Sequence, residues 1–163
     1  MPDVLFAPWR YEYLVAEKSG DCIFCMAAHE PEPKESLVVF RGKNVFVLLN
    51  RYPYTNGHVM VAPYRHEAWL SDSDGETLSE LIQTIAHAER ILVSAYRTDG
   101  LNVGINFGSA AGAGVASHYH VHVVPRWTGD TNFMTVASGV RIIPEEHAVT
   151  LARLRPLFAE GAA

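Results

Sequence analysis

Apolar runs and turn signals alternate over the first half of the chain. Residues 37–41 and 44–50 are β-branched and aromatic runs on either side of Gly42-Lys43, which predicts a hairpin. In the next run, residues 58–63, apolar residues occupy consecutive positions. Since successive strand residues point to opposite faces, this run predicts a third strand that is buried on both sides.

The second half begins with a long stretch of helical spacing. Ser73 and Glu76 fit a capping box at its start, and Gly100 ends it. Its apolar positions are Leu78, Leu81, Ile82, Ile85, Leu92, Ala95 and Tyr96. A terminal helix is predicted for residues 144–159, with Leu151, Leu154 and Phe158 on one face.

Two further strands, residues 102–107 and 118–124, flank the glycine-rich segment 108–114. The combined pattern predicts an α+β fold in which helices are added to an antiparallel sheet. The 163 residues suit one domain that spans residues 1–163.

Composition and charge exclude several classes of protein. With 48% hydrophobic and 19% charged residues, the chain can form a core, which excludes disorder. No apolar stretch approaches the roughly 18 to 20 residues of a membrane span. The first 20 residues lack a basic start followed by an apolar block, so we expect no secretory signal and a cytoplasmic protein. A net charge of −5 argues against nucleic acid as a partner.

Three of the eight histidines, His118, His120 and His122, alternate with apolar residues. On a strand they would share one face at intervals of about 6 to 7 Å, with Tyr119 and its apolar neighbours turned into the core. Three uses compete. The histidines could form an open metal site, or one could act as a nucleophile with two helpers. In the third arrangement one histidine leaves the row to bind a metal.

Cys22 and Cys25 have the spacing of half a zinc site or of a redox pair. His66 and His118 could complete a tetrahedral Cys₂His₂ set. Such a set leaves no position for water, so the zinc would be structural and His120 would stay free for catalysis.

The run from His118 to Val124, HYHVHVV, resembles the signature of the histidine triad family of nucleotide hydrolases and transferases. An ordered set of further segments resembles a bacterial branch near the diadenosine tetraphosphate phosphorylases and hydrolases: LFAPWR (5–10), CIFC (22–25), NRYPY (50–54), GH (57–58), PYRH (63–66) and PRW (125–127). The resemblance implies a five-stranded antiparallel sheet with one long helix and a C-terminal helix. It also implies a homodimer that shares its sheet and its long helix.

The resemblance also implies roles for individual residues. His120 is the nucleophile that attacks the α-phosphorus to give a nucleotidyl-imidazole intermediate. His122 and Asn106 hold the non-bridging phosphate oxygens. Apart from the resemblance, the glycine-rich loop 108–114, with Gly112 and Gly114, could present backbone N–H groups to the same oxygens. A neutral imidazole that attacks through one nitrogen keeps its proton on the other, which we expect to hydrogen-bond to a carbonyl.

The nucleotide pocket follows from the same resemblance. Asn50 matches the position that binds the ribose hydroxyls, His58 lies close to substrate, and Ile23 and Phe24 wall the base pocket, with adenine as the base by analogy. Considered without the family, Asn50 opens a turn, His58 caps a strand edge, and the two apolar residues pack in the core.

One position departs from the family. Many members have a glutamine four residues before the first histidine of the row, where this chain has Gly114. Loss of the amide removes one means of orienting water and leaves room for inorganic phosphate, which favours phosphorolysis over hydrolysis. Three isolated histidines, His29, His87 and His147, are assigned no function.

The leading hypothesis is an enzyme that cleaves the α-phosphate bond of an adenine dinucleotide, such as diadenosine tetraphosphate, through a covalent nucleotidyl-histidine. One alternative is a zinc hydrolase in which all three histidines of the row bind a catalytic metal. Another is a nucleotide-binding regulatory or scaffold protein with little turnover.

Overall fold

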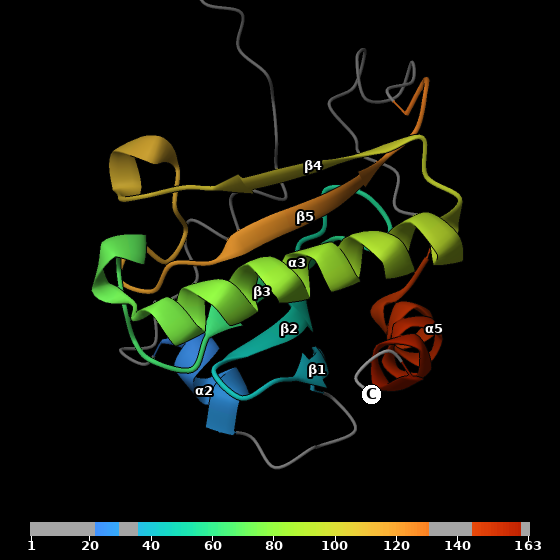
Figure 1. The fold of residues 1–163 in the computed structure, drawn as a ribbon. Helices are drawn as coiled ribbons and strands as arrows, with labels where there is room; N and C mark the ends of the chain where they lie inside the picture. Colours follow the sequence, from blue (N-terminus) through green and yellow to red (C-terminus); the bar gives the residue numbers. More distant parts are fainter. Residues whose placement is uncertain (1–21, 30–35, 131–144, 161–163) are drawn as a thin grey trace, which may run out of the picture.

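A five-stranded antiparallel sheet is the centre of the fold (Figure 1). The computed structural model describes residues 22–29, 36–130 and 145–160. Within them, the strand order is β1-β2-β3-β5-β4. The strands are β1 (Val38–Arg41), β2 (Val45–Leu49), β3 (Val59–Pro63), β4 (Gly100–Ile105) and β5 (Val121–Arg126). The predicted α+β class, with its five strands and two main helices, is confirmed.

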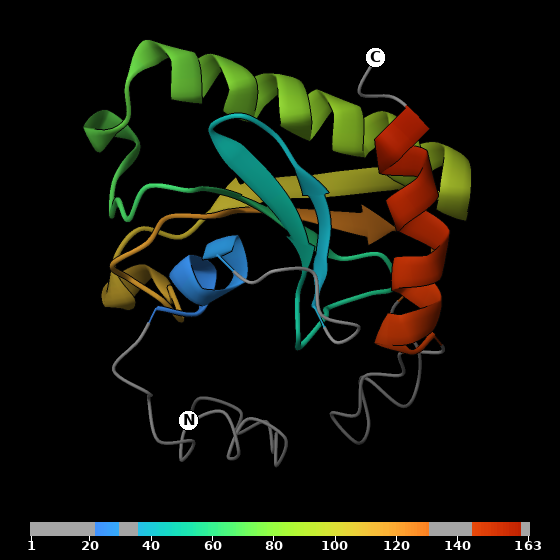
Figure 2. The same ribbon diagram turned by 90° about the horizontal axis from the view of Figure 1, so that it is seen from below.

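Helices cover both faces of this sheet (Figure 2). The long helix α3 (Gly75–Tyr96) crosses one face, and the C-terminal helix α5 (His147–Glu160) lies beside α3 and β1. The short helix α2 (Ile23–His29) lies on the opposite face, which we call the α2 face. The sequence pattern did not predict α2, although its two buried residues, Phe24 and Ala28, are one helical turn apart.

Alternation along the strands divides the core in two. Val45, Val47 and Leu49 of β2 belong to the cluster under α3 and α5. Phe46 and Leu48 belong to the cluster on the α2 face. Every residue of β2 and β3 is buried. The sequence predicts this for β3, whose run is apolar on both sides.

The capping box predicted at Ser73 is wrong. Helix α3 begins one residue later, and Asp74 is its N-cap, because the Asp74 side chain accepts a hydrogen bond from the N–H of Thr77 at 2.8 Å. The helix also ends earlier than predicted. Arg97 adopts a left-handed conformation with φ of 48°, and Gly100 already belongs to β4.

The strand predicted from His118 begins only at Val121. Val121 is the first residue of β5 and already pairs with both neighbouring strands, opposite Val61 and Ile105. The N–H of Tyr119 donates instead to the carbonyl oxygen of Glu67, at 2.7 Å. Tyr119 nevertheless points into the core under α3, as its alternation with the histidines predicts.

A membrane span requires a helix of sufficient length and hydropathy. In the part of the chain that the structure describes, no helix is both long enough and apolar enough to cross a bilayer.

The packing of α5 can be tested with two truncations in the same helix. Leu154 is fully buried, whereas Val149 is 50% exposed. We expect Leu154→Ala to lower the free energy of unfolding by about 2 to 5 kcal/mol, because it leaves a cavity. Val149→Ala should change it by less than about 0.5 kcal/mol. Urea denaturation measures both, and equal losses would mean that α5 does not pack as described.

Candidate active site and metal cluster

The polar residues predicted for the site share the α2 face of the sheet. His122 pairs with Met60 of β3 and with Gly104 of β4. Met60 belongs to the α2-face core, and His58 lies two residues before it. Asn50 and Asn106 lie two residues beyond Leu48 and Gly104, so strand alternation directs both to this face.

His120 is buried and its imidazole is oriented by its own backbone. The side chain is 6% exposed, and Nδ1 lies 3.0 Å from the carbonyl oxygen of His118. A carbonyl oxygen can only accept, so Nδ1 carries the proton and Nε2 carries the lone pair. Burial lowers the pKa of His120 below its usual range, so the ring is neutral near pH 7. The sequence predicts this tautomer and its carbonyl partner.

A second chain of contacts sets the proton on His122. The N–H of Tyr54 donates to Nδ1 of His58 at 3.1 Å, so Nε2 of His58 carries the proton. That Nε2 lies 3.0 Å from Nδ1 of His122 and donates to it. Neutral His122 therefore carries its proton on Nε2, as a donor for an anionic oxygen. Burial, with the neighbouring His120 as the smaller cause, lowers the pKa of His122 to about 4.

His58 lies behind His122. Its side chain is 1% exposed and its ring packs 4.7 Å from that of Tyr54. His58 contacts His122 directly, and its closeness to substrate stays a prediction.

Asn50 opens a turn, as its residue type predicts. Its Oδ1 accepts the N–H of Tyr52 at 2.9 Å, and its Nδ2 lies 3.4 Å from Nδ1 of His58. Its carbonyl oxygen accepts from Nε2 of His147 in α5, at 3.0 Å. Asn50 is thus fixed by three segments, and its contact with ribose stays a prediction.

The two residues expected to wall the base pocket differ in exposure. Phe24 is 1% exposed, and its ring lies 5.2 Å from that of His118 and 4.5 Å from that of His120. Phe24 therefore packs in the core of the α2 face, and its role as a wall of the base pocket stays a prediction. Ile23 is 49% exposed.

The glycine-rich loop is folded on itself. It contains the short helix η2 (Ser109–Ala111), and the N–H of Gly112 donates to the carbonyl oxygen of Ser109 at 3.0 Å. The Gly112 amide is therefore engaged within the loop, and an anion could use it only after this turn opens. Gly114 is exposed.

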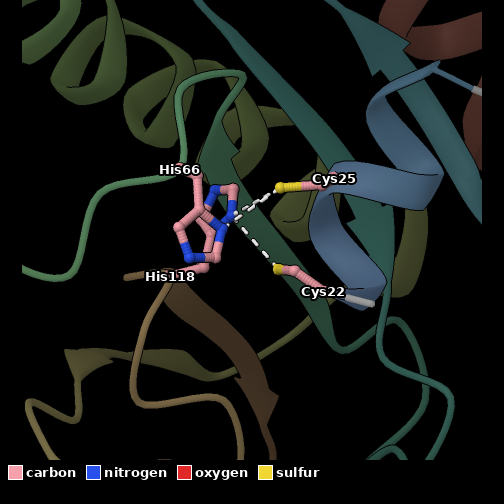
Figure 3. Close-up of side chains that lie close together, drawn as sticks. All are labelled: Cys22, Cys25, His66 and His118. Carbon is pink, nitrogen blue, oxygen red and sulfur yellow. Dashed lines mark hydrogen bonds between the residues drawn. The ribbon is translucent and has the colours of Figure 1, made fainter. Parts of the chain in front are cut away.

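Four side chains from three segments converge beside this row (Figure 3). Cys22 directly precedes α2 and Cys25 lies in its first turn. His66 follows β3, and His118 precedes β5. Their ligand atoms all lie within 4.8 Å of one another, so the cluster could hold a metal ion. Among the described residues, His120 and His122 do not belong to such a group.

The distances in the cluster fit a tetrahedral ion. Nδ1 of His66 lies 3.2 Å from Sγ of Cys25, and Nδ1 of His118 lies 3.4 Å and 3.6 Å from Sγ of Cys22 and Cys25. Tetrahedral zinc with ordinary bond lengths places sulfur and nitrogen ligands about 3.6 Å apart. Nε2 of His118 donates to the carbonyl oxygen of Pro63 at 2.9 Å, which leaves Nδ1 deprotonated and free to coordinate.

Comparison with known proteins agrees with this arrangement. Residues 32–129 match the family model described as HIT domain. The AP-4-A phosphorylase of Mycobacterium tuberculosis is 47% identical over 149 residues, which cover 86% of this chain and 76% of the relative.

Two solved structures have the same fold. One is a zinc-bound histidine triad family protein from Mycobacterium smegmatis, with 28% identity and a TM-score of 0.69, covering 86% of this chain and 94% of that one. The other is a hypothetical histidine triad nucleotide-binding protein from Sulfolobus tokodaii, with 27% identity and a TM-score of 0.68, covering 85% and 93%.

The buried, neutral state of His122 predicts a pH dependence of stability. Its pKa is about 4 in the folded chain and 6.5 for the free side chain. As pH falls through this window the unfolded chain takes up a proton first, so stability present above about pH 6.5 is lost toward pH 4. Between about pH 7.5 and pH 5, His122→Gln should lose less stability in urea denaturation than the wild type.

The exposed His29 provides the matched control, and His29→Gln should lose as much stability as the wild type. Equal losses in His122→Gln and the wild type would contradict a buried neutral His122.

Proposed function

Because the chain belongs to the HIT domain family, we propose that it cleaves diadenosine tetraphosphate by phosphorolysis, through a covalent adenylyl intermediate on His120. The observation that carries the proposal is the neutral His120 imidazole, whose Nδ1 is held by the His118 carbonyl and whose Nε2 carries the lone pair. The similarity to an AP-4-A phosphorylase at 47% identity supports the substrate class.

The first step forms a bond between Nε2 of His120 and the α-phosphorus. The bond from this phosphorus to the bridging oxygen breaks, and ATP leaves. The Nε2–H of His122, whose tautomer is set by His58, donates a hydrogen bond to a non-bridging oxygen. This hydrogen bond stabilises the negative charge of the transition state. Asn106, on the same face, supplies a second donor.

The second step releases the nucleotide. An oxygen of inorganic phosphate attacks the phosphorus of the adenylyl-histidine, the P–N bond breaks, and ADP leaves with the imidazole restored. The exposed position of Gly114 provides no amide side chain to orient water in place of phosphate.

Zinc in the cluster of Cys22, Cys25, His66 and His118 would be structural. Four protein ligands complete its coordination, so it would join α2 to the segment that carries His120 and would take no part in the chemistry. This assignment disfavours a zinc hydrolase that uses the whole histidine row.

We also propose a homodimer. Strand β4 lies at the edge of the sheet, and its residue Val103 is 51% exposed. On α3, Ile82 is 64% exposed. A second copy that extends the sheet across β4 would cover such apolar surface.

Replacement of His120 tests the nucleophile. His120→Ala should lose cleavage of diadenosine tetraphosphate by at least about a thousandfold, since no other group forms the covalent bond. Its zinc content should equal that of the wild type by elemental analysis, because His120 is not a ligand. The exposed-histidine variant His29→Ala should retain full activity.

Two outcomes oppose the assignment. Loss of zinc in His120→Ala would favour a catalytic metal on the histidine row. Tight nucleotide binding by the wild type with no product in any assay would favour a regulatory or scaffold protein.

Product analysis tests phosphorolysis. With inorganic phosphate the wild type should release ADP and ATP, and the rate should rise with phosphate concentration. Gly114→Gln should raise the ratio of AMP to ADP severalfold, because an amide there can orient water. AMP as the main product at every phosphate concentration would show that the enzyme is a hydrolase.

A further inference from the structure

Glu67 is a buried acid that directly follows a proposed metal ligand. Its side chain is 7% exposed, and Nε of Arg65 lies 3.0 Å from one carboxylate oxygen. The other oxygen accepts a hydrogen bond from the hydroxyl of Ser73. The sequence pattern predicts Ser73 as the N-cap of α3, but in the structure its hydroxyl binds Glu67 instead.

The contacts of Glu67 close a ring around Tyr119. Because a carboxylate only accepts, the Ser73 hydroxyl donates to Glu67 and its oxygen accepts from the Tyr119 phenol, at 2.7 Å. The backbone of the same glutamate accepts the N–H of Tyr119, also at 2.7 Å. Tyr119 is 1% exposed. We call Glu67, Ser73 and Tyr119 together the Glu67 clamp.

The clamp holds a segment that the sheet does not. Strand pairing ends at Val121, so the ladder supplies no hydrogen bonds to Tyr119 and its two histidine neighbours. Hydrogen bonds at its N–H and at its phenol fix both the backbone and the ring of Tyr119. Its ring fills the core under α3, on the face opposite to the imidazole of His120.

We propose that the Glu67 clamp is a positioning device that aims the His120 imidazole at the α-phosphorus. This inference rests on the proposed function. Because the clamp lies on the face away from the nucleotide, it contributes nothing to binding. Its loss should lower kcat and leave KM for diadenosine tetraphosphate unchanged, since a small displacement of an attacking atom lowers the rate steeply.

Removal of one oxygen atom tests the clamp. Tyr119→Phe keeps the ring and deletes the donor to Ser73, and we expect kcat to fall about tenfold at constant phosphate, with KM within about twofold of the wild type. The matched control is Tyr96→Phe. The Tyr96 phenol, at the last residue of α3, donates to the carboxylate of Glu145 at 2.7 Å, and neither residue belongs to the Glu67 clamp. Tyr96→Phe should lower the midpoint of thermal unfolding about as much as Tyr119→Phe does, but it should retain the wild-type kcat.

The serine provides a second route that keeps the aromatic core intact. Ser73→Ala should lower kcat as Tyr119→Phe does, and Ser73→Thr should restore it, because threonine keeps the hydroxyl. The double variant should lose no more than the more affected single variant, since both delete the same connection. Zinc content should stay at the wild-type level throughout.

The result that overturns the clamp is wild-type kcat in both Tyr119→Phe and Ser73→Ala. A fall in kcat no larger than that of Tyr96→Phe, or one matched by a rise in KM, would also overturn it. These outcomes differ from failure of the proposed function, in which His120→Ala itself retains turnover.

Discussion

The segment from His118 to His120 lies outside the hydrogen-bonded ladder, and the rest of the site depends on the contacts that hold it. Each residue has its own support. His118 is fixed by the Pro63 carbonyl and points at the cysteines, Tyr119 is bound to Glu67, and His120 donates to the carbonyl of His118. Because strand pairing does not constrain these residues, the side-chain and backbone contacts alone determine where the nucleophile points.

The position of α2 links the metal cluster to this chemistry. One turn of helix brings Cys22 and Cys25 to the two histidine ligands and inserts Phe24 against His118 and His120. Phe24 packs against His120, and burial of that imidazole lowers its pKa, so the ring is neutral at physiological pH. A structural ion here would thus stabilise the environment that makes the histidines reactive, without contact with substrate.

Local patterns predicted the sheet, the two main helices and the face that the histidines occupy, because alternation and helical spacing report which residues are buried. They failed where two neighbouring side chains suit the same position and a contact distant in sequence decides between them. Both Ser73 and Asp74 suit an N-cap, and the choice depends on Glu67 and Tyr119, distant in sequence. The late start of β5 likewise depends on a single long-range bond from Tyr119 to Glu67. No local signal marked Glu67. The only hints of α2 were the three-residue spacing of the cysteines and the one-turn spacing of Phe24 and Ala28.

The central claim is that Nε2 of His120 forms a bond to the nucleotide, and a trapped intermediate tests it most directly. The protein should be mixed with diadenosine tetraphosphate without inorganic phosphate, quenched at alkaline pH and analysed by intact and peptide mass spectrometry. The account predicts one adenylyl group per chain, attached to His120 and discharged as ADP when phosphate is added. Full turnover with no adduct, or an adduct on any other residue, would contradict it.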